Sequence, residues 1–116
     1  MRPLQIAMAL TLGASILAPT LAHADAVAAG RRLWLKYNCY GCHGINAGGG
    51  MGPNVRGKGP GDVASAINGD EREGGMRSFR DVVSPADRGS MAWNISAYLA
   101  TIGTANEPIW VDWWLH

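Results

Sequence analysis

The sequence lacks an excess of charge of one sign, since ten Lys and Arg residues stand against nine Asp and Glu residues in 116. Proteins that bind nucleic acid normally carry a basic face that pairs with phosphates, so this balance argues against that class. It also argues against a strongly basic docking ring. We therefore expect no nucleic-acid partner, and only a mild effect of salt on association with other proteins.

The sequence also lacks an apolar run long enough to span a membrane. The N-terminal run from Ile6 to Leu17 is shorter than the roughly 20 residues that a spanning helix needs. Arg2 before the run and Ala22-His23-Ala24 after it are typical of a secretory signal peptide. We predict that residues 1–24 are removed after Ala24, leaving a periplasmic domain, residues 25–116, with no membrane span.

Large apolar residues are scarce between His43 and Gly61, where glycine is abundant. A mature domain of this size buries only about 60 to 65% of its unfolded surface, so its core is marginal. Such domains often need a staple, a metal or a cofactor. Something other than side chains is therefore expected to fill this part of the core.

Cysteine is scarce as well, and its placement indicates one chemistry. The only two copies are Cys39 and Cys42, and His43 follows directly. The pattern C-x-x-C-H is the attachment motif of c-type haem. Two thiols three residues apart on a helical turn can each add to one vinyl group of the same porphyrin, and the adjacent imidazole then lies under the iron. The motif predicts one covalently bound haem c, with His43 as an iron ligand.

Three other interpretations of the cysteine pair are open. A Cys39–Cys42 disulfide would close a very small loop and would stabilise the protein little. A thioredoxin-like redox pair needs an alternating β/α context, which the surrounding pattern does not indicate. A structural zinc site needs four protein ligands, whereas the only further histidine of the mature chain is His116.

The apolar spacing predicts an all-α domain with about three main helices. The first is expected over residues 25–38, with Val27, Gly30, Trp34 and Tyr37 near one face. A glycine inside a helix costs about 1 kcal/mol relative to alanine. Its presence at position 30 therefore indicates close contact with another helix.

Between the first helix and the last, we expect a glycine-rich loop over 44–61, a short helix over 62–68 and an irregular stretch over 69–80. The last helix should begin at Ser84-Pro85, where a capping residue precedes a proline at the first helical position. It should stop at Gly103. Its apolar face consists of Met91, Ile95, Tyr98, Leu99 and Ile102.

The tail, from about residue 104, carries three of the five tryptophans, at positions 110, 113 and 114. One interpretation is that the tail folds back and covers the chain's own core, as large aromatic side chains often do. The other is that the tail anchors an interface, where tryptophan is enriched. The sequence leaves both interpretations open.

The second axial ligand decides whether the iron carries electrons or binds other molecules. A carrier fills the sixth position, usually with a methionine thioether, which raises the reduction potential. Met51 is too close to His43 to reach the far face of the porphyrin, and Met91 is most simply core filler. Met76 follows two glycines that let the backbone approach the ring. We predict Met76 as the ligand, with a packed side chain as the alternative.

A metal-bound histidine usually donates its other N–H to an oxygen acceptor, which orients the ring and tunes the metal. The Pro53 carbonyl lies on the loop shortly after His43. We therefore predict Pro53 as the acceptor for His43 and as part of the cofactor site. The alternative is that Gly52-Pro53 forms only a rigid turn.

At these residues the chain resembles the class I cytochromes c. The resemblance implies a small all-α cytochrome c fold in which Gly30 and Trp34 meet Ile95, Tyr98 or Leu99. It also implies that Pro53 accepts from His43 and that Met76 ligates the iron. Many members have proline after that methionine, where this chain has Arg77, which leaves the loop less rigid. The matching pieces are Gly30, Trp34, Cys39 to Gly44, Gly52 to Gly57, Gly75 to Phe79 and Tyr98-Leu99.

The stretch from Tyr37 to Gly44 and the Trp-rich tail are similar to the cytochromes c that accept electrons from quinoprotein (PQQ) alcohol dehydrogenases. This implies a monomeric electron carrier that is not an enzyme. Its donor would be a quinoprotein dehydrogenase, and its acceptor a downstream cytochrome or a terminal oxidase. Two alternatives remain: a haem enzyme or gas sensor with an open iron site, and a fixed haem subunit of a dehydrogenase complex.

Overall fold

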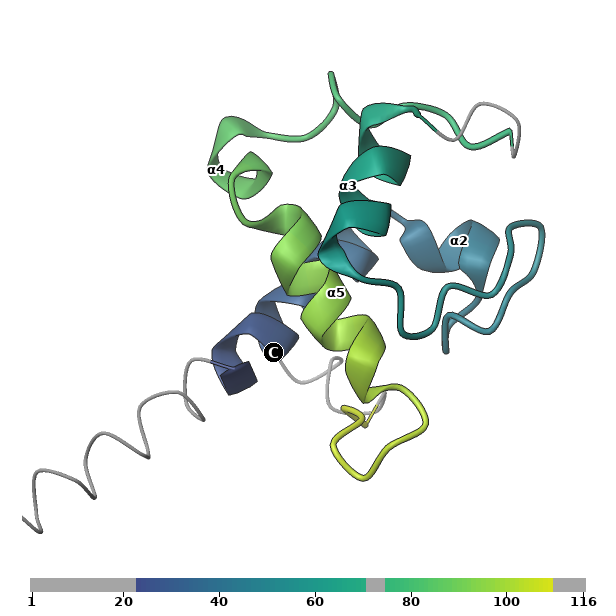
Figure 1. Cartoon of the computed structure of the whole chain (residues 1–116), viewed down its shortest axis with the longest axis vertical. Coiled ribbons are helices and arrows are strands. Elements are labelled where there is room, and N and C mark those ends of the chain that lie inside the picture. The colour runs from purple at the N-terminus through teal and green to yellow at the C-terminus, as the bar shows by residue number, and fades with distance from the viewer. Residues whose placement is uncertain (1–22, 71–74, 110–116) are drawn as a thin grey trace, which may run out of the picture.

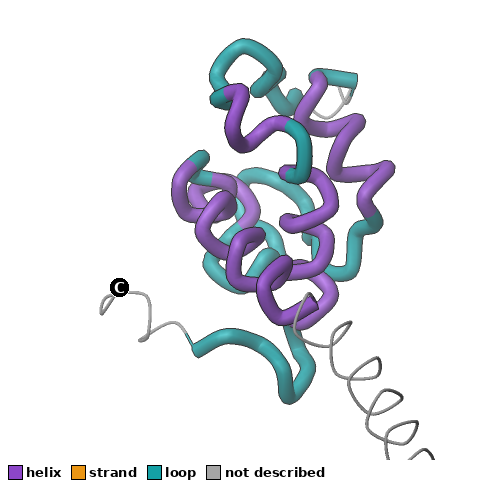
Figure 2. The backbone as a smooth tube through the Cα atoms, turned by 90° about the vertical axis from the view of Figure 1, so that its left-hand side faces the viewer, coloured by secondary structure: helices purple, strands orange, loops and turns teal. Residues whose placement is uncertain are grey.

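The computed structural model describes residues 23–70 and 75–109, and this part of the chain consists of helices and loops without a strand (Figure 2). The predicted all-α class is therefore confirmed. The helices are residues 23–36, α2 at Cys39–His43, α3 at Pro60–Asn68, α4 at Pro85–Arg88 and α5 at Met91–Thr101 (Figure 1).

The helix over 23–36 crosses α5 at Gly30. A β-carbon at this position would lie 1.9 Å from the Asn94 carbonyl oxygen and 2.9 Å from Tyr98 Cβ, so only glycine allows the approach. One turn further on, the rings of Trp34 and Tyr98 have centroids 6.0 Å apart, which is within the range of favourable aromatic pairs. The close crossing predicted from Gly30 is confirmed, with Asn94 as an additional contact.

The core lies around α5, whose predicted apolar face is entirely buried. Helix α3 packs against α5 and buries Val63 between them. Each large aliphatic or aromatic side chain buried in this way stabilises the fold by about 1.5–3 kcal/mol. The buried apolar residues are Val27, Leu33, Trp34, Ala47, Val63, Val83, Met91, Ile95, Tyr98, Leu99 and Ile102.

The single helix predicted from Ser84 to Gly103 is wrong, because the segment forms two helices. Gly89 follows α4, and Ser90 leaves the helical region (φ −120°, ψ 2°) before α5 begins. Glycine costs a helix about 1 kcal/mol and serine competes for backbone hydrogen bonds, so the break falls at this pair. Pro85 does occupy the first turn of α4. The Ser84 hydroxyl donates to Asp87 (3.0 Å) and makes no capping bond to the helix.

Two other boundaries also shift. The first helix stops at residue 36, because the next two residues form a turn in which Asn38 takes a left-handed conformation (φ 57°). Asparagine is one of the few residues that visit this region. Helix α3 begins at Pro60, since proline suits the first turn of a helix. The turn at Asn38 has the larger consequence, because it separates α2 from the first helix.

A polar cluster joins the end of the first helix to the start of α4. Asp87 Oδ2 accepts hydrogen bonds from Lys36 Nζ (2.7 Å) and from the hydroxyls of Tyr37 (2.6 Å) and Ser84 (3.0 Å). These donors, Lys36 foremost, lower the pKa of the Asp87 carboxyl to about 2. The Ser84 backbone N–H also donates to the Tyr37 oxygen (3.1 Å). The cluster therefore holds the segment before α2 against α4.

Within residues 23–70 and 75–109, no helix is both long and apolar enough to span a membrane. The predicted signal peptide lies outside the described residues except for positions 23 and 24, which are helical and exposed. The three tryptophans of the tail also lie outside them. The last described residue, Ile109, accepts a hydrogen bond at its carbonyl from the Arg31 guanidinium (2.8 Å).

Candidate functional site

Cys39, Cys42 and His43 lie on the single turn of α2. Residues at positions i, i+3 and i+4 of a helix share one face, so both thiols and the imidazole point to the same side. The turn lies between two residues with positive φ, Asn38 at 57° and Gly44 at 85°. The geometry that C-x-x-C-H needs is therefore present before any cofactor is considered.

The two thiols are unbridged, with Cys39 half-buried and Cys42 exposed. Burial raises the pKa of the Cys39 thiol to about 11, whereas redox-active cysteines have a lowered pKa. Among the described residues, no three His, Cys, Asp or Glu side chains are grouped so that they could hold a metal ion. This part of the structure thus offers no support for a disulfide, a thioredoxin-like pair or a zinc site.

The His43 imidazole is held by the loop that follows α2. Its Nδ1 lies 2.9 Å from the Pro53 carbonyl oxygen. Because a carbonyl oxygen only accepts, Nδ1 carries the proton, and Nε2 is the ring nitrogen that can bind a metal. The contact is the one that the sequence suggested for Pro53, and its effect on a bound iron stays a prediction.

Glycine allows the loop to lie this close to α2. The Gly52 N–H donates to the Cys42 carbonyl (2.7 Å), and the Gly49 N–H donates to the His43 carbonyl (2.8 Å). A β-carbon on Gly52 would lie 2.9 Å from both Cε1 and Nδ1 of His43, and one on Gly50 would lie 2.9 Å from the Cys42 carbonyl oxygen. The run of glycines predicted only a loop, and this close approach of the loop to α2 was not predicted.

Trp34 lies beside His43, which the sequence analysis also missed. The two ring centroids are 6.0 Å apart, with the planes tilted by 41°. Trp34 is buried, and its indole N–H has no acceptor among the described residues, which is unusual for a buried donor. Helical spacing placed Trp34 on one face of the first helix, and the resemblance to the class I cytochromes c placed it only at the crossing with α5. Its contact with His43 depends on the turn at Asn38, which the spacing did not reveal.

The donor set fits a covalently bound haem. Two free thiols lie three positions apart on one turn, and the neighbouring imidazole has one nitrogen tied to the protein and the other available to iron. The unpaired Trp34 indole N–H beside this imidazole leaves a buried donor for an acceptor that the described protein does not supply. The residues that the sequence singled out on α2 are thus brought together as haem attachment requires.

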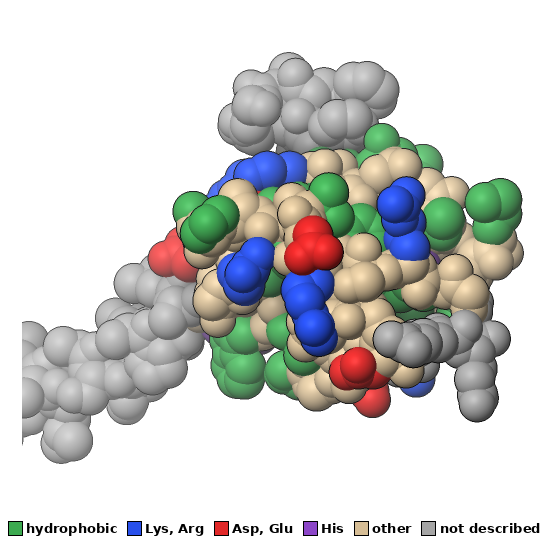
Figure 3. Space-filling model, turned by 90° about the horizontal axis from the view of Figure 1, so that it is seen from above, with side chains coloured by type: hydrophobic (Ala, Val, Ile, Leu, Met, Phe, Trp, Pro, Cys, Tyr) green, Lys and Arg blue, Asp and Glu red, His purple; other side chains and the backbone are tan. Residues whose placement is uncertain are grey.

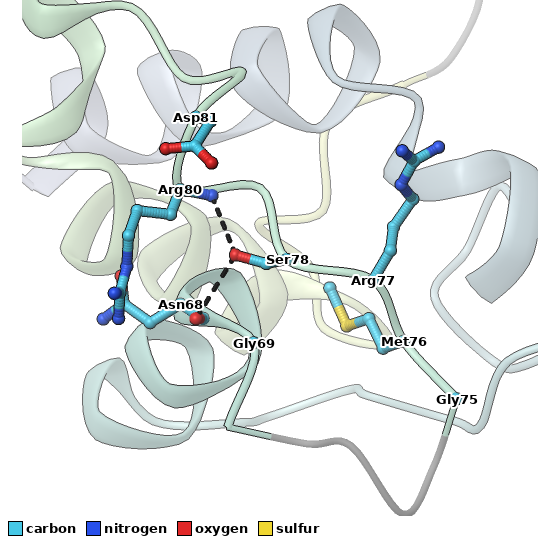
Figure 4. A pocket seen from close by; sticks show the side chains of 8 residues that line it. All are labelled: Asn68, Gly69, Gly75, Met76, Arg77, Ser78, Arg80 and Asp81. Carbon is cyan, nitrogen blue, oxygen red and sulfur yellow. Dashed lines mark hydrogen bonds between the residues drawn. The ribbon is translucent and has the colours of Figure 1, made fainter.

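Met76 lines a separate hollow of about 430 Å³, between the end of α3 and the segment that leads to α4 (Figure 4). Neither cysteine nor His43 lines that hollow. In Figure 4 the Met76 thioether and the Arg77 guanidinium leave the segment in different directions. Met91 is buried in the core, as expected, and Met51 is 90% exposed. Iron ligation by Met76 stays a prediction.

Comparison with protein families gives a match over most of the described chain. Residues 25–99 match the family described as cytochrome c oxidase, cbb3-type, subunit III. The matched region covers more than half of the chain and contains α2, Pro53 and Met76. Searches of the curated proteins and of the solved structures gave no match. The family match and the geometry of α2 therefore lead independently to the same kind of site.

Proposed function

The chain belongs to the cbb3-type subunit III family of c-type cytochromes, and from this premise we propose that it is a periplasmic single-haem carrier that transfers one electron at a time. A cytochrome c domain supports haem-based electron transport. The observation that carries the proposal is the α2 turn, where two free thiols precede an imidazole that is already tied to the Pro53 carbonyl. The count of one haem rests on the single C-x-x-C-H in the sequence.

Haem supplies, when bound, an iron that accepts and releases one electron. The residues of α2 would hold the group: the thiols of Cys39 and Cys42 would each supply one thioether bond to a vinyl side chain. His43 Nε2 would ligate the iron, while the Pro53 carbonyl, which accepts from Nδ1, would keep the imidazole from turning and make it a stronger donor. Trp34 and the core behind it cover one side of the His43 ring.

Met76 is our proposed ligand on the opposite side. Met91 is committed to the core and Met51 projects into solvent. A β-carbon at Gly75 would meet nothing within 4 Å, so the backbone before Met76 has room to adjust. One observation favours the rival, an open iron site that binds gases or performs chemistry: the hollow that Met76 lines contains no residue of α2.

Absorbance of the oxidised holoprotein separates the two functions. A carrier with a thioether ligand shows a weak far-red sulfur-to-iron band, and its reduced form binds carbon monoxide slowly. The Met76→Ala variant should lose the band and bind carbon monoxide rapidly, while Met51→Ala, the matched control, should keep the wild-type behaviour. Rapid carbon monoxide binding by the wild-type protein would contradict the carrier.

We propose a quinoprotein alcohol dehydrogenase as the donor and a downstream cytochrome or a terminal oxidase as the acceptor, on the resemblance of residues 37–44 and the tail. Basic and acidic side chains are interspersed on the face seen in Figure 3, in line with the balanced composition. Transfer should therefore slow by less than about tenfold between low and physiological ionic strength. A decrease of several orders of magnitude would contradict this.

A pull-down with the mature holoprotein from periplasmic extract, followed by mass spectrometry, identifies the partner. Deleting residues 109–116 tests the alternative of a fixed dehydrogenase subunit docked through the tail. In that case the deletion abolishes co-purification and leaves the haem spectrum intact. A mobile carrier keeps its transfer rate after the deletion, and any dehydrogenase that it captures is captured equally by both forms.

The proposed location has its own test. N-terminal sequencing of the protein recovered from the periplasmic fraction should begin at Asp25, because Ala22-His23-Ala24 offers small residues to the signal peptidase. Recovery of the chain in the cytoplasm with residues 1–24 attached would contradict the location without changing the haem site.

A further inference from the structure

One side chain, that of Arg56, holds the two limbs of the loop between α2 and α3 together. Its Nε donates to the Asn46 carbonyl (2.8 Å), and its backbone N–H donates to the Asn54 side-chain oxygen (2.9 Å). A β-carbon on Gly48 would lie 3.0 Å from the Arg56 guanidinium, so the guanidinium lies against the opposite limb of the loop. Arg56 therefore joins residues 46–48 to the limb that contains Pro53.

A backbone hydrogen bond between the same two limbs orders the chain next to Pro53, whose carbonyl accepts from His43. The Val55 N–H donates to the Ala47 carbonyl (2.9 Å). Ala47 is fully buried and takes a left-handed conformation (φ 55°), which costs a non-glycine residue about 1–2 kcal/mol. Proline has no N–H with which to fix its own position. The Pro53 carbonyl is thus set by its neighbours, and Arg56 supplies one side-chain hydrogen bond between the limbs, to the Asn46 carbonyl.

We propose that Arg56 is a positioning residue that holds the Pro53 carbonyl against His43 Nδ1 and thereby sets how strongly His43 donates electrons to the iron. The inference rests on the proposed function, because it needs haem bound at His43. A planar guanidinium suits this role, since it donates to the Asn46 carbonyl while it lies against Gly48 on the same limb, and its stem starts from the limb that contains Pro53.

Positioning and charge act on the reduction potential with opposite signs. A hydrogen bond from Nδ1 makes the imidazole a stronger donor, which favours ferric iron, so loosening that bond raises the potential. A nearby cation favours the less positive ferrous state, so deleting the cation alone lowers the potential. The sign of the change therefore separates the two roles.

The test compares Arg56→Met with Lys58→Met in the holoprotein. Lys58 is exposed and contributes backbone bonds, with its N–H donating to Val55 and its carbonyl accepting from Ser96, and these survive the substitution. The readouts are the midpoint potential and the exchange rate of the His43 Nδ1 proton, measured by NMR on the reduced protein. Arg56→Met should speed exchange about tenfold and shift the ferric-to-ferrous ratio about threefold toward ferrous iron.

Lys58→Met should leave the exchange rate unchanged and should not raise the potential. Arg56→Lys keeps the charge without the fork, so its Nδ1 exchange rate should fall between those of wild type and Arg56→Met, and its potential should rise with no opposing effect of lost charge. Should Arg56→Met fail to fold, Gly48→Ala pushes the guanidinium away by a few tenths of an ångström, and it should give a smaller shift of the same sign. If the His43 Nδ1 proton of Arg56→Met exchanges at the wild-type rate, or if the midpoint potential of this variant falls, the inference is overturned. Failure of the proposed function appears instead in the wild type, as absent haem or rapid carbon monoxide binding.

Discussion

The His43 side and the Met76 side of the proposed haem site differ in how far the polypeptide organises them by itself. His43 has an acceptor at 2.9 Å, a tryptophan beside it and a loop tied to α2 by several backbone hydrogen bonds. The Met76 segment is tied to α3 mainly by the Phe79 N–H to Ile67 (2.8 Å) and by the Ser78 hydroxyl to Asn68 (3.3 Å). The chain therefore ties the segment around His43 more closely to its helix than it ties the Met76 segment to α3.

The largest expected effect concerns the crossing of the first helix with α5, which supports the His43 side of the site. Gly30→Ala puts a β-carbon 1.9 Å from the Asn94 carbonyl oxygen, which forces the first helix away from α5. We expect a loss of about 3 kcal/mol in the free energy of unfolding, measured by urea titration. Gly61→Ala in α3 is the control, because it meets nothing within 4 Å and should gain up to about 1 kcal/mol. Equal changes in the free energy of unfolding for the two variants would contradict the prediction that the helix crossing requires a glycine at position 30.

The next prediction compares one glycine from each side. Gly52→Ala crowds the His43 ring at 2.9 Å, and we expect a cost of about 2 kcal/mol together with faster exchange of the His43 Nδ1 proton. Gly75→Ala meets no neighbour, but its φ of 78° strains any other residue, at a cost of about 1 kcal/mol. Urea titration and NMR exchange measure both. Faster exchange in Gly75→Ala would mean that the two sides are coupled.

A smaller effect is expected on the Met76 side. Ser78→Ala removes the hydroxyl that donates to the Asn68 carbonyl and accepts from the Arg80 N–H (3.2 Å). Because the residue is exposed, we expect a loss of about 0.5–1 kcal/mol in the free energy of unfolding. The far-red band should weaken while the Nδ1 exchange rate stays unchanged. A changed exchange rate of the His43 Nδ1 proton together with an unchanged far-red band would contradict the prediction that this segment acts on the Met76 side.

The smallest expected effect is confined to acid. The pKa of Asp87 is about 2 in the folded protein against an ordinary value of 3.8, because Lys36, Tyr37 and Ser84 donate to it. A depressed pKa stabilises the fold fully above pH 3.8, and that stabilisation is lost as the pH falls toward 2. Asp87→Asn should therefore unfold more readily than wild type at pH 5, and the difference should shrink between pH 4 and pH 2. A constant difference would mean that ionisation of Asp87 contributes nothing.

Much of the fold was predictable where a pattern is local. The apolar stripe of α5 has helical spacing, and Gly30 is out of place in a helix unless another helix lies against it, so both led to correct predictions. The break at Gly89-Ser90 was missed, because single residues of moderate propensity end a helix only when the tertiary contacts on either side favour it. The turn at Asn38 was missed for the same reason.

The sequence by itself determined the chemistry of the attachment site, because two thiols and an imidazole on one helical turn depend only on their spacing along the chain. It also led to Pro53, since an acceptor for a metal-bound histidine has to lie on a nearby loop. Only the tertiary structure decided that Trp34 lies beside His43 and that Arg56 closes the loop. Those contacts join residues separated by turns whose direction depends on single left-handed residues, and no periodicity in the sequence encodes that direction.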